Sequence, residues 1–209
     1  MKNELERRSY SFEVRAEEDE SGSIIVGRPI VYGSRTDIGW FDEIIEPGAL
    51  DMADLRDVRF LVNHDTSKLP LARSRNNNAN STMQLFVDSE GMRIKVRLDV
   101  ENNADARSLY SAVSRGDITG MSFMFGVDDE EWDDLESDHP LRRVKSISSV
   151  VEVSAVTFPA YEATEINARN KEALDNARST LDSARQQRDT SVETELELLK
   201  AKTRLLGGM

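Results

Sequence analysis

Short runs of alternating or β-branched residues recur between residues 9 and 158, and turn-forming residues separate them. Residues 9–15 alternate polar and apolar side chains, as in a half-buried strand. Residues 23–32 are rich in β-branched residues but contain Gly27 and Pro29, which predicts a bulge or a bend, as at a barrel corner. The pattern predicts a mostly β body that forms a barrel with two or three helices. Further strands are expected at residues 58–65, 83–88, 92–100, 117–127 and 142–158.

Two helices are predicted within this body. Residues 102–116 have a helical pattern, with Asn102 or Asn103 as the N-cap and Gly116 at the end. A shorter helix is expected over residues 48–55, directly after a Pro-Gly turn. Both helices are expected to lie on the outside of the barrel.

Charge and composition divide the chain into further parts. Residues 128–138 contain eight acids in eleven positions, which predicts a solvated loop. Residues 168–206 contain neither Pro nor Gly, and this favours a long helix or a helix pair with thin apolar faces. We therefore expect a β-barrel domain at residues 1–165 and a charged helical tail at residues 166–209. The tail is interpreted either as an interaction or scaffold-like segment or as a terminal helix packed on the barrel.

The absence of cysteine narrows the chemistry that the chain can perform. With no Cys and only two His, a thiol nucleophile, a disulfide and the common zinc motifs are excluded. The sequence contains no phosphate-binding or dinucleotide-binding glycine motif, so no cofactor or metal is predicted. A net charge of −12 without a basic stripe argues against nucleic acid as a partner. No signal-peptide pattern and no 18-residue apolar run is present, so no membrane partner is expected.

The two histidines differ in their surroundings. His64 ends the apolar run FLVNH, and a strand end is a rigid place to hold a general base. His139 follows the acidic segment, directly before Pro140, and is expected to be solvated. A purely structural role for His64 stays open at this point, because a histidine at a strand end is often structural.

Ser122 is the favoured nucleophile if the chain is a hydrolase. Without Cys, acyl transfer requires Ser, Thr or another activated oxygen. Ser122 lies between apolar neighbours in TGMSFMFG, where a hydroxyl needs a hydrogen-bond partner, and Gly120 leaves room for a substrate backbone. Met124 stands where a G-x-S-x-G nucleophile elbow has its second glycine, so an α/β-hydrolase is not expected. The alternative is a buried serine bonded to the backbone.

Three sources of carboxylate compete to orient His64. Asp65 is adjacent to it, but neighbouring residues of an extended strand point to opposite faces. Glu152 lies inside the β-branched run VVEVSAV, where a buried carboxylate requires partners. The acids of residues 128–138 are the third source. The alternative for Glu152 is a place on the solvent face of an amphipathic strand.

Four motifs, FDEIIEPGAL, LVNHD, GMSFMF and VEVSAVTFPAY, occur in this order over roughly residues 8–163. Together they resemble the prohead (procapsid maturation) proteases of HK97-type tailed phages, with Met121 where the family often has Leu. The resemblance implies a closed β-barrel of the herpesvirus maturation protease type with a few surrounding helices, plus a C-terminal helical tail. It also implies that Ser122 is the nucleophile, that His64 is the general base and that Glu152 orients His64.

The resemblance further implies a serine endopeptidase that acts during capsid assembly. The expected substrates are the scaffolding segment of the major capsid protein, or a separate scaffold protein, and the protease itself, with a possible homodimer. The expected location is the inside of the procapsid, in the cytoplasm of a bacterial host. The alternative is a non-enzymatic capsid assembly or scaffolding protein, and a third possibility is a β-barrel binding module. Convergence of the three side chains distinguishes the protease from both.

Overall fold

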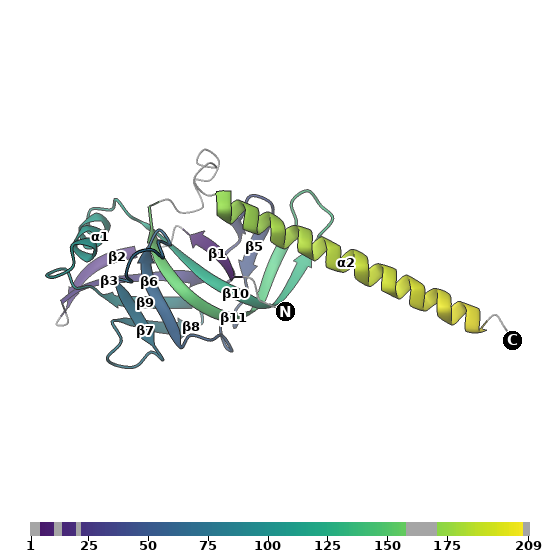
Figure 1. Ribbon diagram of the computed structural model, residues 1–209, viewed down its shortest axis with the longest axis horizontal. Helices are drawn as coiled ribbons and strands as arrows, with labels where there is room; N and C mark the ends of the chain where they lie inside the picture. The colour runs from purple at the N-terminus through teal and green to yellow at the C-terminus, as the bar shows by residue number, and fades with distance from the viewer. Residues whose placement is uncertain (1–4, 11–13, 20–21, 158–170, 207–209) are drawn as a thin grey trace.

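The computed structural model describes residues 5–10, 14–19, 22–157 and 171–206. These residues form a mostly β, α+β structure with two separate sheets (Figure 1). The strand order of the larger sheet is β1-β10-β11-β5-β4, with β6 and β7 attached through β11, and that of the smaller one is β2-β3-β9-β8. The bounds are β1 Leu5–Tyr10, β2 Val14–Asp19, β3 Gly22–Val31, β4 Thr36–Asp37, β5 Asp42–Ile45, β6 Asp57–Val62, β7 Ala72–Arg75, β8 Met83–Asp88, β9 Gly91–Arg97, α1 Ala104–Ser114, β10 Gly120–Asp133, β11 Leu141–Val156 and α2 Lys171–Leu206.

The apolar faces of both sheets share one core. Phe60, Phe123 and Val153 of the larger sheet and Ile25 and Ile94 of the smaller one are fully buried in the same cluster. Burial of such side chains stabilises the fold by about 1.5–3 kcal/mol each. Among the described strands neither sheet closes on itself, because β1, β4 and β7 of the larger sheet and β2 and β8 of the smaller one each have one strand neighbour. The closed barrel expected from the sequence is therefore not confirmed.

The long hairpin of β10 and β11 forms the middle of the larger sheet. β11 pairs antiparallel with β10 along its length and parallel with β5 near its start and with β6 near its end. The expectation of a loop over residues 128–138 is wrong for its first half, because β10 continues to Asp133. Basic residues of β11 neutralise this acidic arm, since Arg143 Nε lies 2.7 Å from Asp133 and Lys145 pairs with Glu131.

Helix α1 and the irregular register of β3 confirm the predicted helix within residues 102–116 and the predicted bulge within residues 23–32. Asn103 caps α1 because its side chain accepts hydrogen bonds from the backbone N–H groups of Asp105 and Ala106. The register of β3 against β9 shifts between Gly27 and Ile30, where Pro29 has no N–H to contribute to the ladder.

The short helix predicted over residues 48–55 is absent from the structure, which has successive turns there. The backbone N–H groups of Ala49, Asp51 and Ala53 each donate to the carbonyl three residues earlier, not four. Gly48 has a φ of 87°, a left-handed conformation that does not continue a helix. The segment therefore forms a compact loop between β5 and β6.

Helix α2 contacts the body with its first half only. Ala177 and Leu181 are buried against Phe41 and Leu135. Further along, apolar side chains such as Leu196 are about half exposed, and the helix extends beyond the sheets on the side of β1 and β5 (Figure 1). Neither helix of the described ranges has an apolar stretch long enough to cross a membrane.

Candidate active site

The segment that carries His64 is a turn fixed to β11. β6 ends at Val62, and both Asn63 and His64 have positive φ values, 52° and 57°. Such a conformation is uncommon for residues other than glycine and persists where neighbours hold it. The Asn63 backbone N–H donates to the Ala155 carbonyl at 2.9 Å, and its side chain exchanges hydrogen bonds with Thr157. His64 therefore lies in a strained turn just beyond the strand.

The three side chains predicted from the sequence converge. Nδ1 of His64 lies 2.6 Å from Oε2 of Glu152, and Nε2 lies 2.6 Å from Oγ of Ser122. Because a carboxylate only accepts hydrogen bonds, Nδ1 carries a hydrogen, which leaves Nε2 of the neutral ring as an acceptor for the Ser122 hydroxyl. Ser122 is 0% exposed and Glu152 is 4% exposed, so water competes little for these bonds.

Strand register explains how residues 30 to 90 positions apart meet. Ser122 of β10 lies opposite Ser154 of β11, and Met124 lies opposite Glu152. On the other side, β6 runs parallel to β11 and leads directly into the turn that holds His64. The group is thus carried by three adjacent strands, with β11 in the middle.

Ser154 is a fourth member that was not predicted from the sequence. Its hydroxyl donates to Oε1 of Glu152 and accepts the backbone N–H of His64 at 3.0 Å. Residues two apart on a strand share a face, so Glu152 and a serine in the same run EVS are an available signal. Ser154 positions both the carboxylate and the strained turn.

Strand β1 closes the remaining side of Ser122. The Ser122 hydroxyl oxygen is 2.7 Å from the carbonyl oxygen of Arg8, and β1 pairs antiparallel with β10 so that Ser9 lies opposite Ser122. A hydroxyl has one hydrogen, so the Arg8 carbonyl competes with His64 for it. The side chains of Ser9 and Tyr10 lie outside the described residues.

A second buried polar cluster lies beside the first and contains five charged groups. Arg8 donates to Glu43 through Nε at 2.6 Å and Nη2 at 2.8 Å, and Arg142 donates to Glu6 at 2.6 and 2.7 Å. Arg142 also pairs with Glu130. Four of the five residues are less than 9% exposed, and buried charges require such pairing.

Burial and pairing shift the pKa values of this second cluster in opposite senses. Burial alone raises the pKa of Glu6, but Arg8 and Arg142 outweigh it and lower that pKa to about 2. Burial alone lowers the pKa of Arg8, but Glu43 and Glu6 outweigh it and hold the pKa above its ordinary value. Glu6 and Arg8 are therefore both charged near neutral pH.

The other candidates considered from sequence lie elsewhere. Asp65 accepts hydrogen bonds from Ser67, at 3.0 Å from its backbone N–H, and does not orient His64. His139 contacts Asp42 at 3.2 Å and lies within 4.8 Å of the ligand atoms of Asp37 and Asp42. These side chains have the donor types that a metal ion requires, but Arg35 already pairs with Asp42 at 2.5 Å.

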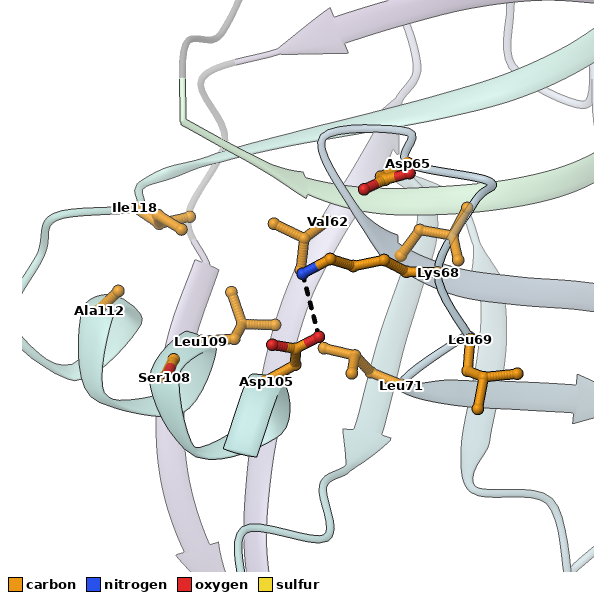
Figure 2. A pocket seen from close by; sticks show the side chains of 11 residues that line it. Val62, Asp65, Lys68, Leu69, Leu71, Asp105, Ser108, Leu109, Ala112 and Ile118 are labelled. Atoms are coloured by element: carbon orange, nitrogen blue, oxygen red, sulfur yellow. Dashed lines mark hydrogen bonds and ion pairs between the residues drawn. The ribbon is translucent and has the colours of Figure 1, made fainter. Parts of the chain in front are cut away.

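A pocket of about 310 Å³ adjoins the turn that holds His64. Figure 2 shows it between α1 and the segment that connects β6 to β7, and Lys68 and Asp105, which both line it, form an ion pair. Most of its wall is apolar, from residues such as Leu71, Leu109 and Ile118.

Comparisons with known proteins identify the family of this chain. The sequence profile of the caudovirus prohead serine proteases matches residues 10–178. No curated protein sequence matches the chain. Among solved structures, the capsid assembly protease of bacteriophage T4 matches with a TM-score of 0.42 and 10% identity, over 75% of this chain and 100% of that one. Because the profile covers most of its length, the chain belongs to the caudovirus prohead serine protease family.

Proposed function

We propose that this prohead serine protease works with Ser122 as nucleophile, His64 as general base and Glu152 as the residue that orients His64. The observation that carries the proposal is the continuous chain of hydrogen bonds from Glu152 through His64 to Ser122, both links being 2.6 Å. A nucleophile in contact with a base that is itself held by an acid is the arrangement that activates a serine. Neither a scaffold nor a simple binding module requires it.

The mechanism follows from the direction of these hydrogen bonds. Nε2 of His64 takes the hydroxyl proton as Ser122 attacks a peptide carbonyl, and the imidazolium that forms is stabilised by Glu152. His64 then gives the proton to the leaving amine, and water hydrolyses the resulting ester. Ser154 keeps Glu152 and the His64 turn in place during both steps.

The substrates belong to the proposal as well. We infer that the protease cleaves the scaffolding segment of the major capsid protein, or a scaffold protein, and its own chain, inside the procapsid and within the bacterial host cytoplasm. We further infer that residues 1–165 form the protease domain, related to the barrel of the herpesvirus enzyme, and that residues 166–209 are a tail that promotes association of copies of the chain, a homodimer being the simplest form. Concentration of the enzyme in a shell then raises its activity.

Co-expression with the capsid protein tests the proposal. We expect the wild type to shorten the capsid protein or itself, as measured by intact mass, and Ser122→Ala to leave both uncut. Ser149→Ala, a change to another serine of the hairpin, serves as the matched control and should cut like the wild type. Identical uncut masses for all three proteins under assembling conditions favour the scaffold alternative. Identical cutting by all three means that Ser122 is not the nucleophile.

The same assay tests the role of the tail. If a dilute protein of residues 1–165 cleaves as fast as the concentrated full-length chain, the tail does not control activity. We expect it to cleave more slowly than the full-length chain at equal concentration, because it lacks the tail that is proposed to bring copies of the chain together.

A further inference from the structure

Strand β1 pairs with the strand that carries Ser122. It is the edge strand of the larger sheet and extends β10 by antiparallel pairing, with Arg8 opposite Phe123 and Ser9 opposite Ser122. Proteins commonly bind extended peptides by adding a strand to a sheet edge in this way. With β1 in place, Ser122 is 0% exposed, so no other peptide reaches its hydroxyl.

One particular peptide bond of β1 lies at the nucleophile. The Ser122 hydroxyl oxygen is 2.7 Å from the carbonyl oxygen of Arg8. Since a C=O bond is about 1.2 Å long, the carbonyl carbon lies within about 4 Å of that hydroxyl oxygen. The bond presented to the proposed nucleophile is therefore the one between Arg8 and Ser9.

The side chain of Arg8 fills a site of matching shape and charge. Glu43, which is 0% exposed, accepts two hydrogen bonds from the Arg8 guanidinium, the paired geometry that distinguishes arginine from other residues. The guanidinium carbon also lies 5.9 and 5.6 Å from the ring centres of Phe41 and Phe125. The Arg8 side chain is thus held by charge, by hydrogen bonds and by aromatic rings.

A second contact recognises the residue two positions earlier. Glu6 receives two hydrogen bonds from Arg142 of β11, at 2.6 and 2.7 Å. Alternate residues of a strand share a face, so Glu6 and Arg8 enter the same cluster side by side. If Glu6 and Arg8 left, the body would keep Glu43, Glu130 and Arg142, which fit another acid and another arginine at the same spacing.

We propose that β1 is an intramolecular substrate that blocks the active site until the Arg8–Ser9 bond is cut, and that the site so freed selects peptides with Arg at the cleaved residue and Glu two residues before it. This inference rests on the proposed function, since it requires Ser122 to be the nucleophile. Beyond the proposed function, the inference names the first peptide bond that the protease cuts and the residues that it prefers in a substrate.

The cutting step uses only the groups already described and water. The Ser122 oxygen bonds to the Arg8 carbonyl carbon while His64 takes the hydroxyl proton. The Arg8–Ser9 bond breaks as His64 returns that proton to the amine of Ser9. Water then splits the ester, which restores the Ser122 hydroxyl and leaves a carboxylate on Arg8.

The first test follows the N-terminus of the full chain over time by intact mass. We expect the wild type to accumulate a product that begins at Ser9, and Ser122→Ala to remain uncut. Arg8→Gln should slow this cut at least about 100-fold, because Glu43 then loses the two charged hydrogen bonds that it accepts from Arg8. Arg7→Gln, which alters the neighbouring arginine outside the Glu43 site, is the matched control and should cut at close to the wild-type rate.

A second test avoids any change to the protein. Processed wild-type enzyme is given a peptide with the sequence of residues 5–10, or the same peptide with Gln in place of the residue that matches Arg8. We expect the arginine peptide to be cut at least about 100-fold faster. Equal rates for the two peptides would overturn the role of Glu43 in selection.

Failure of this inference is distinguishable from failure of the proposed function. Cleavage of the capsid protein that depends on Ser122, with the Arg8–Ser9 bond still intact, overturns the inference and leaves the proposed function standing. Capsid protein cleavage that continues unchanged in Ser122→Ala contradicts the proposed function itself.

Discussion

The larger sheet holds two buried polar clusters of different construction. The first, Ser122 with His64, Glu152 and Ser154, comes from β10, β11 and the turn after β6 and contains a single carboxylate. The second joins three carboxylates to two guanidiniums, and two of its five groups come from the edge strand β1. The first is complete without β1, whereas the second is not.

The two clusters suit different tasks, because the first can transfer a proton and the second holds strand β1 in place. The first cluster is a chain of hydrogen bonds along which a proton can move from Ser122 to His64. A cluster of five charges costs much desolvation free energy, and this cost is offset only while every partner is present. Substitution of the same residue type, Glu to Gln, should therefore have opposite consequences in the two clusters.

The largest effect is expected from Glu152→Gln in the first cluster. We expect kcat/KM for peptide cleavage to fall by about 10³–10⁴-fold, since the loss of an orienting carboxylate leaves His64 in the wrong tautomer. The free energy of unfolding should change by less than about 1 kcal/mol, because an amide of the same shape replaces the carboxylate. Glu131→Gln, on the exposed part of β10, is the control. A large loss of stability with unchanged kcat/KM would mean that the first cluster is structural.

The next effect is expected from Glu43→Gln in the second cluster. Removal of this buried charge leaves Arg8 and Arg142 short of a partner, so the free energy of unfolding should fall by about 3–5 kcal/mol. Denaturant unfolding of the Ser122→Ala form measures it without interference from self-cleavage. Asp57→Asn, which breaks the more exposed pair with Arg73, should lower the free energy of unfolding far less, because solvent screens that pair. Equal costs for the two variants would remove the contrast between buried and exposed pairs.

A smaller effect is expected from Ser154→Ala. The change removes the hydrogen bonds to Glu152 and to the His64 backbone, and we expect kcat to fall about tenfold, equivalent to about 1.4 kcal/mol. KM should stay constant, since Ser154 positions the base and does not contact substrate. Ser154→Thr keeps the hydroxyl and should recover most of kcat. A change in KM alone would contradict the positioning role.

The smallest effect is expected on acidification, through Glu6. Its pKa is about 2 in the folded chain against an ordinary value of 4.5, so its stabilising effect is complete above pH 4.5 and is lost as the pH falls toward 2. Between pH 6 and pH 3.5 this group should cost about 1 kcal/mol of stability. Unfolding of Ser122→Ala with and without Glu6→Gln isolates it. An identical pH dependence in both proteins would show that Glu6 is not held in the cluster.

Much of the first cluster was predictable, because its members lie in recognisable local patterns. A hydroxyl among apolar residues and a carboxylate within a β-branched run both demand partners, so the local sequence makes Ser122 and Glu152 candidates, and the family resemblance supplies their expected roles. The surroundings of His64 were predicted less completely. It was expected at a strand end, and it lies in a left-handed turn that Ser154 holds in place.

The second cluster was not predictable from local patterns. Glu6 and Arg142 are 136 residues apart, and nothing near either one indicates the pairing. The same reason explains the error over the acidic arm of β10, whose basic partners lie in β11. Sequence periodicity reports which face of a strand is buried, but not which distant charge makes that burial tolerable.

The central position of β11 also has a consequence for the order of events during synthesis. Among the residues of the first cluster, Glu152 and Ser154 are the last to be synthesised. The other two members, on β10 and after β6, are brought together only when both strands pair with β11. The pairing of β6 with β11 is parallel and joins residues far apart in the sequence, and such pairings form slowly. At about 5–20 residues per second, a growing chain spends several seconds with Ser122 and His64 already made but apart. A nascent or truncated chain without β11 is therefore inert, and hydrolytic capacity arises only when the body has folded as a whole.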